Sequence, residues 1–328
     1  MTRSAEYVRA CRNFLLHRAH APGAGRAVIV HHPERKQMAD SFQAAGQQLS
    51  AAVECRQVRE ALTGTALIEE IYRLTGDIGE EDVLVLIRSN TVVRGLLSHP
   101  GIGGIPGLLR YCEQLPGART ETMIDPIEED AFLRMYAIDF DELRSFVARL
   151  RALLEATDRV QVTCPLGTQV TLRPRHWIGD ELVFELYTAP VEEETEGRIV
   201  YCGLSSPEKP ALTATVTAGR ITQLDSGEGA GKVTESLRKS LESGDACCRV
   251  VAELGIGTNP GSQLVDSYSG QMENETMRGT CHFDLGANTM FGGANQCEAH
   301  LMGLVWRPTI SGDHGPILSG MALRSPVE

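Results

Sequence analysis

The first ninety residues alternate short apolar runs with segments whose apolar positions recur at helical spacing. Residues 25–31 are typical of a short buried strand, residues 82–87 of a strongly apolar strand, and residues 53–58 form a third short strand-like segment. Residues 33–49, with a proline in the first turn, and residues 61–74 have the three- and four-residue spacing of helices. This β-α-β-α-β order predicts a parallel, doubly wound sheet with right-handed crossovers.

A second pattern begins in the middle of the chain. Residues 128–156 carry apolar positions at helical spacing, which predicts one long or broken helix that bridges two domains. From Asp158 onward β-branched and polar residues alternate, and Pro165-Leu166-Gly167 between two such runs predicts a hairpin. Further strands are expected at residues 182–188, 198–202, 212–216 and 250–254, and a helix at residues 232–243. We therefore expect an α/β domain over residues 1–156 and an α+β domain with a mixed or antiparallel sheet over residues 157–328.

Length, composition and charge narrow the classes of function. A chain of 328 residues suits two domains, and its 42% hydrophobic and 23% charged residues are typical of a globular protein. No apolar run approaches the length of a membrane span, and residues 1–20 lack a signal-peptide core, so we expect a cytoplasmic protein without a membrane partner. The net charge of -12, without a basic stripe, argues against a nucleic-acid partner.

Three local patterns have simpler explanations than a binding site. The glycine-rich residues 101–107 lack the order of a dinucleotide fingerprint and are expected to form a surface loop. Residues 227–233 resemble a phosphate loop but have the wrong spacing, which favours a turn that caps the following helix. The nine cysteines include no CxxC pair and are expected to be mostly reduced, although adjacent Cys247 and Cys248 could bind a soft metal or sense redox state.

The candidate chemistry is concentrated between residues 251 and 302. Glu253, His282 and His300 lie on separate short apolar segments, and carboxylates and imidazoles that converge from such segments can hold a divalent metal ion. Taken alone, the sequence around His282 favours a core histidine that donates to a backbone carbonyl over a metal ligand. Met302 stands two residues after His300, on the same face of a strand, where such a site would most use a second carboxylate.

Glu185 is a further candidate ligand. It lies between Phe184 and Leu186 in an apolar segment that stops at Pro190. Burying a carboxylate there costs free energy unless it is paired or ligated, whereas on an edge strand it would simply face solvent. The sequence leaves both possibilities open.

The order of these motifs resembles that of a known family. The Glu185-Leu-Tyr-Thr-Ala-Pro, Ala-Glu253-Leu-Gly and Gly-Thr-Cys-His282-Phe-Asp-Leu-Gly segments, with the Glu275 turn and the His300 segment, look like those of metallo-aminopeptidases of the aminopeptidase T and S type. They are also similar to those of the related 2,5-dihydroxypyridine dioxygenase. The resemblance implies a thermophilic-aminopeptidase-like fold for a divergent, shortened member, and a homodimer.

The resemblance also implies a ligand set. In the peptidases two metal ions are held by two glutamates, two histidines and an aspartate, which match Glu185, Glu253, His282, His300 and, for the aspartate, Met302. The tyrosine expected near Thr289 is absent. Glu275 matches an acidic residue with a supporting role, so Glu253 and Glu275 are the expected catalytic carboxylates. The cofactor would be zinc, cobalt, manganese or iron, with a single ion, or none, expected after loss of the aspartate.

Three functions remain open at this stage. The first is metal-assisted hydrolysis of a peptide at an incomplete ligand set. The second is an inactive protein that only binds a peptide, as in a ribosomal peptide natural-product pathway. The third is a non-haem iron oxygenase, whose ligands would match Glu253, His300 and Met302, and of these only His300 fits the pattern.

Overall fold

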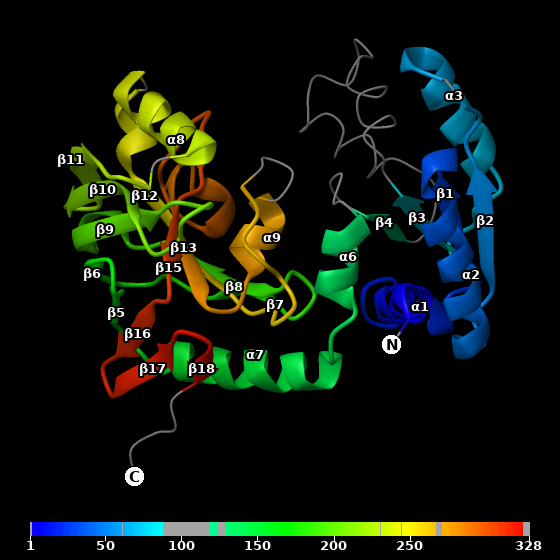
Figure 1. The fold of residues 1–328 in the computed structure, drawn as a ribbon, viewed down its shortest axis with the longest axis horizontal. Helices are drawn as coiled ribbons and strands as arrows, with labels where there is room; N and C mark the ends of the chain where they lie inside the picture. The colour runs from blue at the N-terminus through cyan, green and yellow to red at the C-terminus, as the bar shows by residue number, and fades with distance from the viewer. Residues whose placement is uncertain are drawn as a thin grey trace. The chain divides into compact units, whose positions relative to one another are not determined.

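A computed structural model describes residues 2–60, 62–87, 119–123, 129–229, 231–243, 245–266 and 271–323. The chain forms two compact units, Met1–Ile138 and Asp139–Glu328, whose elements are labelled in Figure 1. This division assigns the helix α7 (Phe140–Glu155) to the second unit, whereas the sequence predicts a domain boundary after residue 156, which would leave this helix in the first domain. The glycine-rich residues 101–107 lie outside the described residues.

The first unit contains the predicted parallel sheet. Its strands run in the order β2-β1-β3-β4, and every neighbouring pair is parallel. The strands are β1 (Ala27–His31), β2 (Val53–Gln57), β3 (Val83–Ile87) and β4 (Arg119–Met123). The helices are α1 (Arg3–Asn13), α2 (Lys36–Leu49), α3 (Gly64–Thr75) and α6 (Glu129–Tyr136). Short helical turns lie at Phe14–Arg18, Ala21–Gly23 and Pro33–Arg35.

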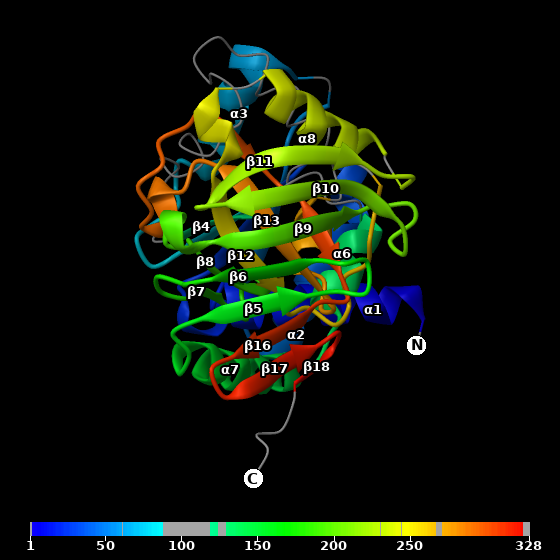
Figure 2. The same ribbon diagram turned by 90° about the vertical axis from the view of Figure 1, so that its left-hand side faces the viewer.

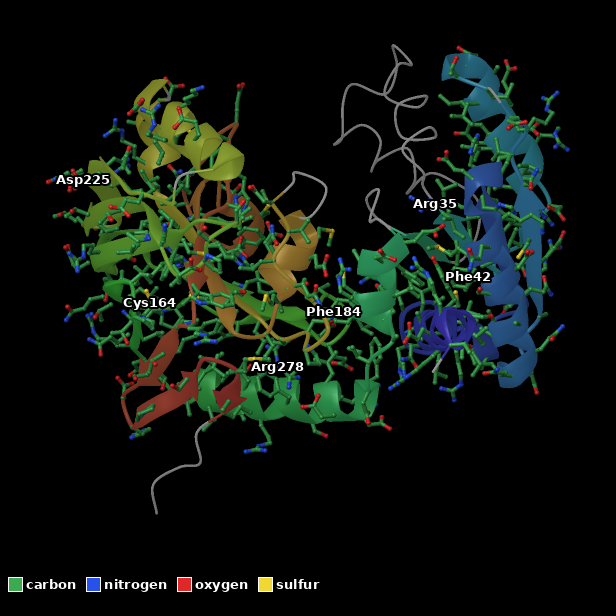
Figure 3. All side chains as sticks on the ribbon, in the orientation of Figure 1. Arg35, Phe42, Cys164, Phe184, Asp225 and Arg278 are labelled. Atoms are coloured by element: carbon green, nitrogen blue, oxygen red, sulfur yellow. A yellow bond between two sulfur atoms is a disulfide. The ribbon has the colours of Figure 1, made fainter. Side chains whose placement is uncertain are left out.

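The core of this unit explains why its central strands read as continuous apolar runs. All residues of β1 and β3 are buried, as is usual when helices cover both faces of a parallel sheet. Alternate residues of these strands pack with Leu67 and Ile71 of α3. Phe14, Phe42 and Phe132, which follow or belong to α1, α2 and α6, form an aromatic cluster, and Phe42 is labelled in Figure 3.

The second unit consists of two antiparallel sheets. The larger sheet has the order β11-β10-β9-β6-β5-β16-β17-β18, and Figure 2 shows these strands side by side with β12 and β13 behind them. Its strands are β5 (Val160–Thr163), β6 (Gln169–Leu172), β9 (Glu196–Cys202), β10 (Pro210–Thr217), β11 (Arg220–Ser226), β16 (Thr309–Gly312), β17 (Gly315–Ser319) and β18 (Ala322–Leu323). The predicted hairpin at Pro165-Leu166-Gly167 is confirmed as the β5–β6 connection.

The smaller sheet has the order β14-β13-β12-β8-β7, with β15 also paired to β13. Its strands are β7 (Ile178–Asp180), β8 (Glu185–Thr188), β12 (Val251–Gly257), β13 (Thr280–Gly286), β14 (His300–Leu301) and β15 (Leu304–Trp306). The remaining helices are α7, α8 (Lys232–Ser243), α9 (Gln271–Thr276), and short turns at Glu192–Glu194, Ala246–Arg249 and Thr289–Phe291. The expected fold class, a parallel α/β sheet followed by an α+β region, is confirmed.

Arg278, a buried cation just before β13, contacts helix α7. The long or broken helix expected over residues 128–156 is broken into α6 and α7, and Asp139 caps the start of α7 by accepting from the backbone amides of Asp141 and Glu142. The Arg278 guanidinium lies 3.8 Å from the centroid of the Phe146 ring and pairs with Glu142 at 2.9 Å, beside α7 in Figure 3.

Among the described residues no helix is long and apolar enough to cross a membrane.

Candidate metal centre

Four neighbouring strands of the smaller sheet present the candidate ligands. Glu185 lies on β8, Glu253 on β12, and His282 and Asp284 on β13. Because alternate residues of a strand point to the same face, the side chains of His282 and Asp284 share one face of the sheet. The strand register sets Glu253 directly opposite Asp284, and His300 of β14 opposite Gly286. His300 is thus a diagonal neighbour of Asp284, close enough for their side chains to meet.

The five side chains form two groups that share Glu253. His282 Nε2 lies 3.6 Å from Glu253 Oε1 and 3.9 Å from Glu185 Oε2. His300 Nε2 lies 3.3 Å from Glu253 Oε2 and 2.9 Å from Asp284 Oδ2. Glu253 therefore presents one oxygen to each imidazole, and each group contains two carboxylates and one imidazole.

Most of this cluster is shielded from water. The exposed fractions of the side chains are 2% for His282, 4% for Glu253, 4% for Asp284, 16% for Glu185 and 30% for His300. Three carboxylates in so little solvent would repel one another strongly without positive charge between them. The more open side lies at His300, which is where a ligand from solution would reach the site.

Gly255 makes room for the His282 ring. It lies opposite His282 in the β12–β13 register, and a methyl group built on it would stand 2.1 Å from the ring atoms Cε1 and Nε2. Any larger residue would push the ring away from Glu185 and Glu253. The Glu253-Leu-Gly255 segment thus supplies a ligand and the space for a second one.

His300 is oriented by the groups around it. Its Nδ1 lies 2.9 Å from the carbonyl oxygen of Ala287, which leaves Nε2 to face the carboxylates. Histidines that bind metals usually donate their other ring N–H to such a carbonyl or carboxylate. The centroid of the His300 ring lies 5.6 Å from that of Phe291, and the Phe291 centroid lies 5.3 Å from that of Tyr187 on β8. These rings form an aromatic row that borders the cluster.

The pKa values show how the charges in the cluster depend on one another. Burial is the main cause that raises the pKa of Glu185 to about 8; His282 opposes this rise, and the charges of Glu275 and Glu253 add to it. Burial also acts to raise the pKa of Glu253, but His282 and His300 bring it down to about 2. The carboxylates raise the pKa of His300 to about 10 against the effect of its burial. A divalent cation would displace these imidazole protons, so its binding should strengthen as pH rises.

The arrangement fits a pair of divalent ions. Glu185 Oε2 and Asp284 Oδ1 are buried and make no hydrogen bond, which is costly for a carboxylate oxygen. Ligand atoms about 2.1 Å from one ion lie roughly 3–3.5 Å apart in tetrahedral or octahedral geometry. The imidazole–carboxylate distances of the two groups fall near that spacing. Carboxylate and imidazole ligands suit zinc, cobalt, manganese and iron, as the sequence led us to expect.

The structure brings together all four metal ligands expected from sequence: Glu185, Glu253, His282 and His300. Glu275, on α9, lies near enough to Glu185 for its charge to raise the pKa of that group. Met302 is elsewhere: it packs in an apolar cluster with Cys202, Leu204 and Leu304. Thr289 lies in a short helical turn, and Tyr187 is the tyrosine close enough to feel the charges of Glu185 and Glu253.

Sequence reasoning missed Asp284. It is the carboxylate that completes the His300 group, and it supplies the oxygen ligand that the resemblance leads us to expect from an aspartate at position 302. The available signal was its position two residues after His282, which puts both side chains on one strand face.

Comparisons with known proteins are consistent with this fold. The chain is similar to 2,5-dihydroxypyridine dioxygenase from Pseudomonas putida KT2440, with a TM-score of 0.64, 18% identity, and 99% of each chain covered. It is also similar to AmpT from Thermus thermophilus, with a TM-score of 0.60, 14% identity, and 98% of this chain and 99% of AmpT covered. No protein-family model and no curated protein sequence matches the chain. The resemblance read from the motifs is thus confirmed at the level of the fold.

Proposed function

We propose that this protein is a metal-dependent hydrolase that acts on peptides with a free amino end. The proposal depends above all on Glu253, whose two oxygens face two imidazoles in two ligand groups. A shared carboxylate is what a pair of cations needs to offset their mutual repulsion. The likeness of the fold to AmpT supports the choice of a peptide substrate.

Each residue of the cluster has a defined part in this proposal. Glu185 and His282 would hold one ion, Asp284 and His300 would hold the other, and Glu253 would offer one oxygen to each group. Bound ions would lower the pKa of a water molecule and polarise the scissile carbonyl. Because Asp284 supplies the carboxylate that the sequence lacks at Met302, the proposed site holds two ions rather than one.

Glu275 is the proposed proton carrier. It belongs to neither ligand group, yet its charge is felt at Glu185. It is half-buried, which is suitable for a carboxylate that accepts a proton from a nucleophile and returns it to a leaving amine.

The oxygenase alternative is weaker. A ferrous centre of that class uses two histidines and one carboxylate on one ion. Among the described residues the two imidazoles of the cluster fall in different groups, each with two carboxylates. The ligand chemistry therefore favours hydrolysis, although the dioxygenase shares the fold.

A peptide-binding protein without catalysis is the second candidate. Thr289 stands where the peptidase pattern has a tyrosine, so that position offers no phenol group. Tyr187 and Phe291 could still hold an apolar side chain of a peptide beside the cluster.

Elemental analysis and a peptide assay test the main proposal together. Protein purified without chelators or affinity-tag metal should contain about two equivalents of a transition metal and release amino acids from short peptides. Removal of the metal with a chelator should abolish release, and added metal should restore it. Less than about a tenth of an equivalent of metal after dialysis against zinc, cobalt, manganese and iron would rule out the hydrolase. Metal without release, with peptide binding seen by calorimetry, would establish the binding protein.

Substitution of Glu275 with glutamine should separate catalysis from metal binding. We expect kcat to fall by about 10²–10⁴-fold, the usual contribution of a general base, with little change in KM. The metal content should stay at the wild-type value because Glu275 is not a ligand. Glu193→Gln, at an exposed position, is the matched control and should leave kcat unchanged. Loss of metal in Glu275→Gln would instead make Glu275 a ligand.

A further inference from the structure

Three cysteine sulfurs meet at a second site, formed by the segments that precede β12 and β14 of the smaller sheet. Cys247 and Cys297 form a disulfide, and the thiol of Cys248 is free. Cys248 Sγ lies 3.5 Å from Cys297 Sγ, so the free thiol contacts one end of the disulfide directly. Cys297 is thus bonded to one member of an adjacent cysteine pair and in contact with the other.

The two sides of this site come from well-anchored segments. Cys247 and Cys248 lie in the short helix Ala246–Arg249, which leads into β12. Cys297 lies in the segment before β14, where Asn295 Nδ2 donates to the carbonyl oxygens of Cys247, at 2.9 Å, and of Gly286, at 2.6 Å. These bonds keep Cys297 beside the cysteine pair independently of the disulfide. Both cysteines can therefore reach Cys297 without a large movement of the chain.

We propose that Cys247, Cys248 and Cys297 form a thiol–disulfide exchange site. The thiolate of Cys248 attacks Cys297 Sγ, the Cys248–Cys297 bond forms, and the Cys247–Cys297 bond breaks with its electron pair on Cys247. The proton lost by Cys248 is regained by Cys247, so no external oxidant or reductant is needed. Two disulfide isomers interconvert, and both connect the segment before His300 to the start of β12.

The exchange brings the reactive thiol closer to solvent. Cys248 is buried, whereas Cys247 and Cys297 are half-buried. The thiol freed at Cys247 is therefore more accessible than the one consumed at Cys248. Its substrate class is a low-molecular-weight disulfide, which the Cys247 thiolate would cleave to give a mixed disulfide and one equivalent of free thiol. Reactivity of this kind depends on access to the thiolate. This inference is independent of the proposed hydrolase activity.

Mapping the disulfide in the full-length oxidised protein tests the exchange. The protein is quenched in acid with N-ethylmaleimide and digested without reduction, and fragmentation in a mass spectrometer then identifies the cysteine bonded to Cys297. We expect both the Cys247–Cys297 and the Cys248–Cys297 linkages, with the maleimide on the cysteine left free. A single linkage, to Cys247 alone, would overturn the proposal.

Two variants provide an independent check. Oxidised Cys247→Ser should form the Cys248–Cys297 disulfide, and finding both of these thiols free would refute the exchange. Cys248→Ser should retain only the Cys247–Cys297 linkage and lose all native-state labelling of Cys247 by iodoacetamide. Cys55→Ser changes a free, half-buried thiol of the first unit and should show both linkages, as the wild type does.

Discussion

Substitution of Glu253 with glutamine should remove both of the proposed metal ions and nearly all of the proposed hydrolytic activity. Glu253 is the residue common to the two ligand groups, so the change removes an anionic oxygen from each. We expect less than about a tenth of the wild-type metal content, because metal affinity depends on deprotonated ligands. The value of kcat/KM should fall by at least about 10²–10³-fold, the scale for loss of one electrostatic group in an active site. Elemental analysis and a peptide-release assay on the same preparation measure both effects.

The control for this change must be another buried glutamate. Glu70 of α3 is buried and paired with Arg73 and Arg59, in the first unit. Glu70→Gln should lower the stability of the fold but leave the metal content per folded molecule unchanged. Circular dichroism shows whether each variant is folded. A folded Glu253→Gln protein with two full equivalents of metal would contradict the shared-ligand arrangement.

The parts of the fold that sequence predicted best are those with strong local patterns. The apolar runs of β1 and β3 identify buried parallel strands, and the turn at Gly167, whose φ is +103°, joins two clearly alternating strands. The sequence predicts helix α8 over residues 232–243, and the structure has it at the same bounds. In each case the signal lies within about a dozen consecutive residues, so no knowledge of distant contacts is needed.

The candidate site was only partly predictable because strand pairing decides its composition. Alternation on one strand relates Asp284 to His282, but the opposition of Asp284 to Glu253 depends on a register that shifts between Val251 and Glu253. Such an irregularity changes which residues face each other, and nothing in the local sequence marks it. The face shared by Glu253 and Asp284 is therefore known only from the folded sheet.

At Met302 the alternation of side chains along a strand leads to a wrong prediction. We placed it beside His300 because residues two apart on a strand share a face. Strand β14 ends at Leu301, however, and the chain then passes to β15 at Leu304. The alternation therefore does not extend to Met302, whose side chain packs with Leu204 and Leu304. An apolar residue is what that position requires.

Substitution of Asp284 with asparagine should remove one of the two ions. The His300 group loses a carboxylate, whereas Glu185, Glu253 and His282 remain intact. We expect about one equivalent of metal and a fall in kcat/KM of about 10²–10³-fold. Asp225→Asn, at an exposed position on β11 labelled in Figure 3, is the matched control and should retain two equivalents. Retention of both ions in Asp284→Asn would show that Asp284 is not a ligand.

The double variant Asp284→Asn with Met302→Asp decides where the missing carboxylate belongs. If residue 302 faced the metal centre, a new aspartate there would restore the second ion. Because Met302 is buried among apolar side chains, we expect no restoration. Burying an unpaired carboxylate should instead lower the free energy of unfolding by several kcal/mol, on the order of 3–5. Denaturant unfolding and metal analysis of Met302→Asp alone separate the two effects. Recovery of two equivalents in the double variant would return the ligand role to residue 302 and leave Asp284 as its substitute.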